Sequence, residues 1–258
     1  MMPVALTIAG SDPSGGAGIQ ADLKTFHQFG VYGEAAITLL TVQNTVGVTA
    51  IEILAPDFVA AQIHAVVEDI PPHAVKTGAL GNRAMVEAVA YELAAIRCPI
   101  VVDPVMISKH GAPLMSDDAR QAVLAILMPL ATLITPNLHE AEAMTGLPVT
   151  NLDQMYEAAR LLAGLGAQAV LIKGGHLAGA AIDLLYDGKE FLQFESERLD
   201  TPHTHGTGCT YSAAITALLA RGLTLTDALP RAKKYITEAI RTNPGLGQGH
   251  GPVNHFVG

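Results

Sequence analysis

Short apolar runs alternate along the chain with longer segments whose apolar residues recur at helical spacing. This alternation constrains the fold more than any other feature of the sequence. A strand is expected over Val4–Ala9, and a helix over Gly16–Phe29 follows it directly. Repeated strand–helix units form a mostly parallel sheet with helices on both faces. The pattern therefore predicts an α/β fold with three layers.

The same alternation runs through the rest of the chain. Further strands are expected over Ala35–Val42, Thr49–Leu54, Ala74–Thr77, Pro99–Asp103, Leu133–Thr135 and Ala169–Lys173, with an edge hairpin formed by Ala181–Tyr186 and Phe191–Phe194. Further helices are expected over Pro56–Asp69, Arg83–Ile96, from the capping residue Ser116 through Leu127, and over Glu140–Thr145, Leu152–Leu165, Gly208–Arg221 and Leu225–Arg241. No linker or shift in composition divides the chain, so a single domain is expected over residues 1–258.

Composition narrows the class of protein. Half of the residues are hydrophobic and 15% are charged, which favours one large core over disorder. Asp and Glu number 24 against 15 Lys and Arg, so the basic footprint of a nucleic-acid-binding protein is absent. We find no signal peptide and no apolar stretch of the roughly 18–20 residues that cross a bilayer. A cytoplasmic protein that binds neither nucleic acid nor membrane is expected.

Polar and glycine-rich residues gather where the predicted parallel strands end. In open α/β sheets, ligands bind outside the carboxyl ends of the strands. The segments that collect there are Gly10–Gly18, Gln43–Asn44, Asp103, Asn137, Lys173–His176 and Gly206–Cys209. A ligand site at this edge of the sheet is the expectation.

The segment Gly206-Thr207-Gly208-Cys209 opens a long predicted helix. Its two glycines let successive backbone N–H groups converge, and the helix directs its positive end at the same point. Such a turn can bind a phosphate or a developing anion. A plain helix-entry turn with a buried cysteine is the alternative.

This glycine-rich turn, with Cys209 where most ribokinase-like kinases carry Asp, resembles the hydroxymethylpyrimidine kinases. The resemblance extends through residues 6–24, 43–45, 137–140, 173–176 and 249–255, in order along the whole chain. It implies a three-layer α/β/α ribokinase-like fold and a homodimer. The implied reaction uses Mg²⁺ and ATP to phosphorylate 4-amino-5-hydroxymethyl-2-methylpyrimidine, and then its monophosphate, in thiamin biosynthesis.

The resemblance also implies where the substrate binds. It makes Gly10–Gly18 a substrate loop, with Gly10, Asp12 and Ala17 as contacts and Asp12 near the reacting hydroxyl or phosphates. The amide of Gln43 offers a donor and an acceptor, as an aminopyrimidine edge requires, although a surface loop Gln is equally compatible with the pattern. Ala79 follows another predicted strand and is expected to line the pocket.

Five polar residues are expected to organise ATP and magnesium. The resemblance assigns Lys173 to the ATP phosphates and Asn137 with Glu140 to phosphate and Mg²⁺ organisation, and Thr207 of the glycine-rich turn is expected to bind ATP. Asp103 ends a buried apolar strand, where an unpaired carboxylate is costly, so it is expected to hold Mg²⁺ through water. Asn137 with Glu140 three residues later also fits an ordinary capping box. Asp103 fits a turn before a proline, and Lys173 fits a solvated strand end.

Cys209 has two possible roles. Its thiolate could take the proton of the substrate hydroxyl, since a helix N-terminus lowers the pKa of a thiol. Its backbone N–H could instead contribute to an anion hole, with Gly206, Thr207 and Gly208 beside it. Phosphoryl transfer depends mainly on positioning and charge neutralisation, which favours the second role.

Three other functions stay open. A pyridoxal or pyridoxine kinase is the nearest, because its substrate also carries a hydroxymethyl group on an aromatic nitrogen ring. The spacing Gly16-x-Gly18-x-x-Ala21 weakly matches a dinucleotide fingerprint and would suit an NAD-dependent oxidoreductase. A non-catalytic pyrimidine-binding regulator is the third.

Residues 108–111 are expected to form a lid.

Overall fold

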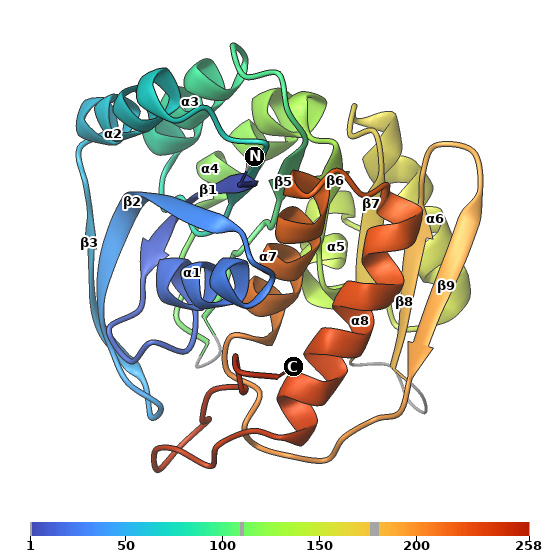
Figure 1. The fold of residues 1–258 in the computed structure, drawn as a ribbon. Coiled ribbons are helices and arrows are strands. Elements are labelled where there is room, and N and C mark those ends of the chain that lie inside the picture. The colour runs from blue at the N-terminus through green and yellow to red at the C-terminus, as the bar shows by residue number, and fades with distance from the viewer. Residues whose placement is uncertain (1, 109–110, 176–180, 258) are drawn as a thin grey trace.

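The computed structural model describes residues 2–108, 111–175 and 181–257, and these form one sheet packed between two layers of helices (Figure 1). The nine strands lie in the order β3-β2-β1-β4-β5-β6-β7-β8-β9. The six strands from β2 to β7 in this order are parallel. The edge strand β3 is antiparallel to β2, and at the other end β8 is antiparallel to both β7 and the edge strand β9. The predicted α/β architecture is confirmed.

The strands have the following bounds: β1 Val4–Ser11, β2 Tyr32–Gln43, β3 Val48–Ile53, β4 Ala74–Thr77, β5 Ile100–Val102, β6 Leu133–Ile134, β7 Val170–Gly174, β8 Ala181–Tyr186 and β9 Phe191–Ser196. The helices are α1 Gly18–Gln28, α2 Pro56–Asp69, α3 Arg83–Leu93, α4 Asp117–Ala122, α5 Leu138–Thr145, α6 Leu152–Gly164, α7 Thr207–Ala220 and α8 Leu225–Arg241. A π-helical turn, η1 (Val123–Leu127), and a 3₁₀ turn, η2 (Met128–Leu130), follow α4.

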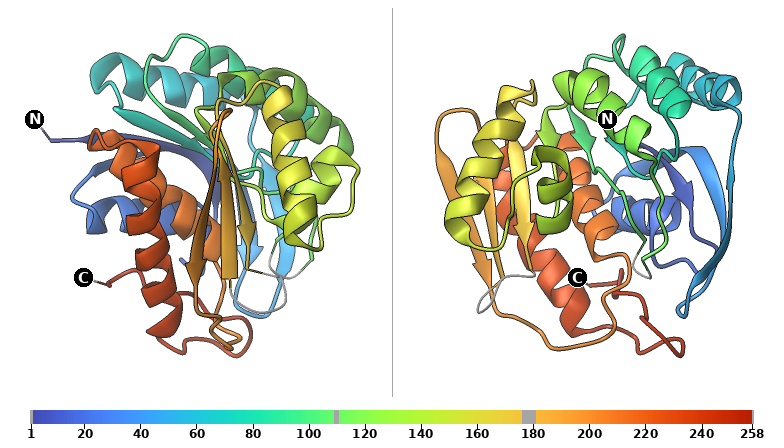
Figure 2. Two further views of the ribbon diagram at one scale, coloured as in Figure 1. Left: turned by 90° about the vertical axis from the view of Figure 1, so that its right-hand side faces the viewer. Right: turned by 180° about the vertical axis from the view of Figure 1, so that it is seen from behind.

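Successive side chains of each parallel strand point into two different cores. On β5, Ile100 and Val102 pack against the layer formed by helices α2 to α6, whereas Val101 packs against α1, α7 and α8. Figure 2 shows the two helical layers on opposite faces of the sheet. Burial on both faces explains why the strands read as continuous apolar runs.

The first helix begins two residues later than predicted, at Gly18 instead of Gly16. The Asp12 carboxylate accepts hydrogen bonds from the backbone N–H groups of Gly16 and Ala17, at 3.2 and 2.9 Å. These bonds hold residues 12–17 in a compact loop, and the helix starts only after it.

The prediction of one regular helix capped by Ser116 through Leu127 is wrong in detail. Ser116 stands at the N-cap position, but its hydroxyl donates to the Asp118 carboxylate and accepts no helix N–H. After Ala122 the helix widens into the π-helical turn η1 before it ends. Local spacing of apolar residues does not distinguish an α-helical from a π-helical turn.

No helix in the described parts of the chain is long and apolar enough to cross a membrane.

Candidate active site

Helix α7 begins at a backbone position in the left-handed region that only glycine can occupy here. Gly206 is the N-cap residue, with φ of 78°, and a Cβ on it would lie 1.7 Å from the carbonyl oxygen of Gly16. The close approach packs the turn directly against the first loop. The Thr207 N–H donates to Thr204 O at 3.3 Å. The N–H groups of Gly208 and Cys209 follow it in the first turn, where helix geometry supplies no acceptor, so they can bind an anion.

Lys173 at the end of β7 brings a positive charge to this helix terminus. Its Nζ lies 3.3 Å from the position that a Cβ on Gly208 would take. The Lys173 backbone N–H donates to Pro136 O at 2.8 Å, and the residue bridges to Asn137 in parallel register. An ammonium group and a helix N-terminus therefore face the same space, as phosphate binding requires.

Asp103 ties three elements together beneath this positive centre. Its Oδ1 accepts hydrogen bonds from Lys173 Nζ at 3.0 Å and Thr135 Oγ1 at 3.2 Å, and its Oδ2 accepts from Ser212 Oγ of α7 at 2.9 Å. Burial raises the pKa of Asp103, but the charges of Lys173 and Lys76 and the hydrogen bonds from Lys173 and Ser212 together outweigh burial, so the net pKa is lowered. The carboxylate is therefore ionised, and it fixes Lys173 relative to α7.

Asn137 and Glu140 form the capping box that the sequence offered as the alternative. Asn137 Oδ1 accepts from the Glu140 N–H at 2.9 Å, and Glu140 Oε2 accepts from the Asn137 N–H at 2.8 Å. Burial raises the pKa of Glu140 to about 7, opposed by Lys173 and supported by Asp103. Because the charges of Lys173 and Asp103 both act on Glu140, its carboxyl belongs to the same cluster of charged side chains.

The first loop is organised around Asp12, whose carboxylate accepts five hydrogen bonds. The donors are the N–H and hydroxyl of Ser14, the N–H groups of Gly16 and Ala17, and His205 Nε2 at 2.7 Å. Burial raises the pKa of Asp12, yet these bonds, above all the one from His205, lower it overall. Asp12 thus builds the loop and joins it to the turn before α7.

Gln43 ends β2 and reaches the same junction. Its amide lies 3.3 Å from His205 Nε2 and 3.2 Å from Thr41 Oγ1. The structure therefore brings Gln43 together with Asp12 and the Gly206 turn, although β2 and α7 are far apart in the sequence.

Gly10, Ala17 and Ala79 are the other residues that were predicted to contact the substrate. Gly10 sits at an irregularity in the pairing of β1 with β2, and a Cβ on it would lie 2.6 Å from Leu39 Cδ1, so packing in the core requires glycine there. Ala17 is the N-cap of α1. Ala79 is buried, and its carbonyl oxygen accepts from Thr38 Oγ1 at 2.6 Å.

The Cys209 thiol is neutral at physiological pH in this environment. Burial raises the pKa of Cys209 to about 11, although the charge of Lys76 opposes the effect. Lys76 in turn forms a buried ion pair with Asp22 of α1, with Nζ 3.0 Å from Oδ2. A positively charged group lies near the thiol without being enough to ionise it.

Sequence reasoning missed several of these residues. Asp22 stands on the apolar face of its predicted helix, and a charge in that setting signals an ion pair. The hydroxyl groups of Ser212 and Thr135 carry no comparable signal. The part of His205 in joining the first loop and the end of β2 to the turn before α7 was not predicted either.

The weak dinucleotide fingerprint has another explanation. Gly16 and Gly18 belong to the loop held by Asp12, and a Cβ on Gly18 would lie 2.2 Å from Gly10 O. These glycines permit close packing within the loop and against His205.

The oxygen-rich donor set suits magnesium better than a tightly held transition metal. In the described residues, no three His, Cys, Asp or Glu side chains converge on one point. Asp103 and Glu140 offer carboxylates beside the phosphate-binding space, and Mg²⁺ commonly uses one or two carboxylates together with substrate phosphates and waters. The residues present fit such an ion.

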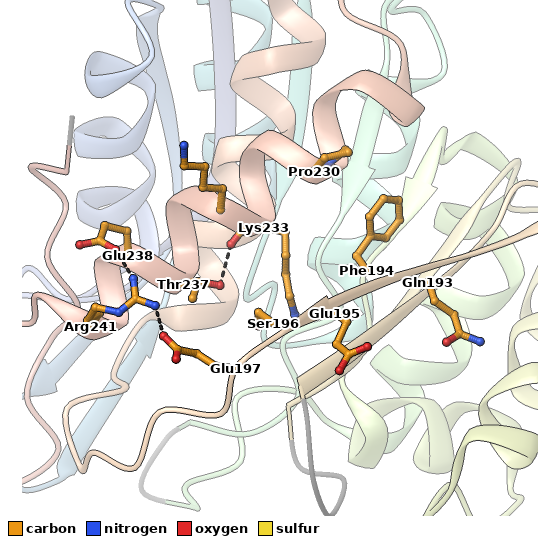
Figure 3. Close-up of a pocket in the computed structure, with 11 residues that line it drawn as sticks. Gln193, Phe194, Glu195, Ser196, Glu197, Pro230, Lys233, Thr237, Glu238 and Arg241 are labelled. Carbon is orange, nitrogen blue, oxygen red and sulfur yellow. Dashed lines mark hydrogen bonds and ion pairs between the residues drawn. The ribbon is translucent and has the colours of Figure 1, made fainter.

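A separate groove of about 580 Å³ lies between β9 and α8 (Figure 3). Its lining includes Lys233, Glu238 and Arg241, and Arg241 forms ion pairs with Glu197 and Glu238. None of the predicted site residues lines this groove.

Two sequence predictions fall partly outside the described residues. Lys109 and His110 of the expected lid lie there, and so does His176 of the glycine-rich segment after β7.

A three-layer fold whose strand ends bring together a lysine, buried carboxylates and the N-terminus of a long helix defines a small-molecule kinase of the ribokinase-like class. The comparisons with known proteins agree. The chain belongs to the phosphomethylpyrimidine kinase family, whose profile matches residues 12–254.

Relatives and solved structures are similar over nearly the whole chain. A hydroxymethylpyrimidine/phosphomethylpyrimidine kinase of Synechococcus elongatus is 48% identical, with 99% of this chain and 98% of that protein covered. The thiamine biosynthesis bifunctional protein ThiED of Geobacter sulfurreducens is 51% identical over 98% of this chain, which spans only 52% of that longer protein. An ADP complex of Bacillus subtilis pyridoxal kinase superimposes with a TM-score of 0.92 at 42% identity, covering 99% and 98% of the two chains.

Proposed function

We propose that the protein transfers the γ-phosphoryl group of ATP to the hydroxymethyl oxygen of 4-amino-5-hydroxymethyl-2-methylpyrimidine. A second transfer then converts the monophosphate to the diphosphate for thiamin biosynthesis. The observation that carries the proposal is the convergence of Lys173, the α7 N-terminus and Gln43 at one edge of the sheet. This convergence places a phosphate-binding site next to a side chain that can form hydrogen bonds with a nitrogen-containing ring.

Each residue has a defined part in this reaction. The N–H groups of Gly208 and Cys209 and the Lys173 ammonium stabilise the charge that develops on the transferring phosphoryl group. Asp103 holds Lys173 in position. Thr207 and Asn137 line the ATP phosphates. Gln43, with the Gly10–Ala17 loop and Ala79, holds the pyrimidine so that its hydroxyl faces the γ-phosphate.

Asp103 and Glu140 would hold a magnesium ion through water beside the ATP phosphates. When bound, it neutralises charge on the phosphates. The pKa of Glu140 is raised to about 7, so its carboxyl is only partly ionised near neutral pH. The pKa of Asp103 is lowered, so its carboxylate stays ionised beside Lys173.

The function is tested by measuring ADP release with ATP, Mg²⁺ and each of four acceptors: the hydroxymethylpyrimidine, its monophosphate, pyridoxal and pyridoxine. We expect turnover with both pyrimidines. Absence of turnover with both pyrimidines would refute the proposal. Omission of Mg²⁺ is expected to abolish turnover.

Pyridoxal phosphorylation is a second candidate, because the similar solved structures include pyridoxal kinases. One of them, from Staphylococcus aureus, is a complex with an ATP analogue and pyridoxal, and it superimposes with a TM-score of 0.91 at 35% identity. A higher kcat/KM with pyridoxal than with either pyrimidine in the same panel would favour this function.

The quaternary state and location are also part of the proposal. We expect a cytoplasmic homodimer, which analytical ultracentrifugation and cell fractionation would test. A monomer at micromolar concentration would contradict the first expectation.

A further inference from the structure

After α8 the chain turns back and ends in a segment that is anchored in the protein (Figure 1). The C-terminal segment, Gly249–His255, is one of the stretches that carry the family resemblance. Val253 and His255 in it are only 1% and 4% exposed, and Val253 packs in the core with α1, α7 and α8. Chain ends are poorly ordered unless contacts hold them, so the partners of this segment show what it holds in place.

The C-terminal segment forms a short parallel bridge with His205. The His205 N–H donates to Gly251 O at 3.0 Å, and the Val253 N–H donates to His205 O at 3.3 Å. Both backbone polar groups of His205 are therefore bonded to the segment. Because the His205 imidazole binds the Asp12 carboxylate, the segment also fixes the residue that holds the first loop.

The C-terminal segment also contacts two parts of the candidate site directly. A Cβ on Gly16 of the first loop would lie 3.1 Å from Pro252 Cβ. In the turn between β2 and β3, Thr45 Oγ1 accepts from the Gly249 N–H at 3.3 Å, and a Cβ on Gly249 would lie 2.1 Å from Thr45 O. This turn directly follows Gln43, so the segment packs beside the end of β2.

Hydrogen bonds to two helices anchor the end of the C-terminal segment. His255 Nε2 lies 3.1 Å from Thr210 Oγ1 in the first turn of α7, and His255 O accepts from Tyr235 Oη of α8 at 3.0 Å. The Asn254 N–H donates to Ala239 O of α8 at 2.9 Å. The segment is thus attached to the core at its end, while its beginning contacts the loops.

These loop contacts lie on the side of the site where the phosphoryl acceptor is proposed to bind. The first loop follows β1 and Gln43 ends β2, whereas Asp103 follows β5 and Lys173 lies on β7. In the sheet, β4 separates β2 and β1 from β5, β6 and β7. The acceptor side and the phosphate side of the site are therefore built from different strands.

We propose that the C-terminal segment positions the acceptor side of the site. Through His205 it holds the Asp12 loop, and through Thr45 it holds the turn after Gln43. This inference rests on the proposed function, in which that loop and Gln43 contact the acceptor. Displacement of the segment weakens acceptor binding and leaves ATP binding nearly unchanged, because catalytic sites depend on the exact placement of the groups that orient a substrate.

Two substitutions displace the segment without removing it. The methyl group of Gly251→Ala would lie 2.3 Å from His203 Nδ1, and that of Gly249→Ala would meet the turn between β2 and β3. Neither glycine has a positive φ, so the strain comes from packing. We expect KM for the hydroxymethylpyrimidine to rise about tenfold or more in both variants, with KM for ATP within about twofold of wild type.

Phe256→Ala is the matched control, because that side chain is next to the segment but 80% exposed. It should keep both KM values of the wild type. If the segment served only to stabilise the fold, the glycine variants would lose active protein, which lowers kcat and leaves both KM values unchanged. That result, or an equal rise of both KM values, would overturn the inference.

Amide hydrogen exchange tests the same inference without a substrate. The N–H groups of Gly16 and Ala17 donate to the Asp12 carboxylate. Both should exchange faster in Gly251→Ala than in the wild type or in Phe256→Ala, because the loop is held less firmly. Unchanged exchange of both amides would contradict the link through His205. If the wild-type protein phosphorylates neither pyrimidine, the proposed function has failed, and the exchange result still decides whether the segment holds the loop.

Discussion

At the scale of single residues, a comparison of Gly208 with Cys209 distinguishes anion binding by backbone N–H groups from base catalysis by a side chain. Both contribute a backbone N–H at the start of α7, but only Cys209 has a side chain that could take a proton. Its pKa of about 11 leaves that side chain protonated. The N–H groups, and not the thiol, are therefore expected to carry most of the rate enhancement.

Cys209→Ala is expected to keep kcat within about tenfold of wild type, because it retains the backbone N–H and the helix. General-base catalysis typically contributes about 10²–10⁴-fold. Steady-state kinetics with the hydroxymethylpyrimidine measures the effect. A loss of more than about 100-fold in a folded variant would establish the thiol as a base.

Gly208→Ala is the matched change at the preceding position. The added methyl would lie 3.3 Å from Lys173 Nζ and would displace the ammonium from the helix terminus. A fall in kcat/KM for ATP larger than that of Cys209→Ala is expected. If both alanine variants behave alike, the placement of Lys173 does not limit the reaction.

Glu140→Gln tests the proposed magnesium role without disturbing the helix. A Gln at this position can still accept the Asn137 N–H in the capping box, so only the charge is lost. We expect the Mg²⁺ concentration for half-maximal activity to rise severalfold while the melting temperature changes little. An unchanged magnesium dependence would remove Glu140 from the proposed ion site.

At the scale of secondary-structure elements, a buried ion pair connects α8 to β8, the neighbour of the strand that carries Lys173. Lys233 Nζ lies 2.7 Å from Asp183 Oδ2 of β8, and Asp183 Oδ1 accepts from the Gly174 N–H at 3.0 Å. A Cβ on Gly174 would also lie 1.9 Å from Ile182 O, so β7 and β8 are tightly joined at this point. The end of β7 is thereby held in place by β8 and α8.

Lys233→Met is expected to destabilise the protein by about 3 kcal/mol, because it leaves the Asp183 carboxylate buried without its cation. Thermal unfolding should show a fall of roughly 6–12 °C for a chain of this size. The matched control is Lys234→Met on the exposed side of α8, which should unfold near the wild-type temperature. Equal effects of the two substitutions would contradict the importance of the buried pair.

At the scale of the whole molecule, Glu34 makes stability depend on pH. Its side chain is buried on β2, and neither carboxylate oxygen has a hydrogen-bond partner among the described residues. Burial, with a smaller contribution from Asp69, raises the pKa of Glu34 to about 7. The folded protein thus keeps a proton that the unfolded chain releases near its ordinary pKa of 4.5.

Because the folded-state pKa is raised, the contribution of Glu34 to stability is fully present below about pH 4.5 and is lost as the pH rises through about 7. Glu34→Gln should therefore be more stable than wild type at pH 8, by about 1–2 kcal/mol, with the difference shrinking toward pH 5. Urea unfolding at the two pH values measures it. A constant difference between the two proteins at both values would show that Glu34 does not titrate in this range.

Most of the fold was predictable because strand and helix periodicity are local properties. The bounds of α2, β4 and α8 were predicted to the residue, and the edge hairpin of β8 and β9 was recognised from its turn. The π-helical turn after α4 and the delayed start of α1 were not predicted. Both depend on contacts that the periodicity of apolar residues does not record.

The sequence by itself determined the α/β class, the glycine-rich anion turn and the edge of the sheet where polar residues collect, since each follows from backbone preference and from burial along one segment. Only the tertiary structure decided that Asp103 pairs with Lys173, that Asp12 meets His205 and that Gln43 joins them. Those contacts link residues from different strands, loops and helices. Their geometry arises from the packing of the whole sheet, which no local pattern encodes.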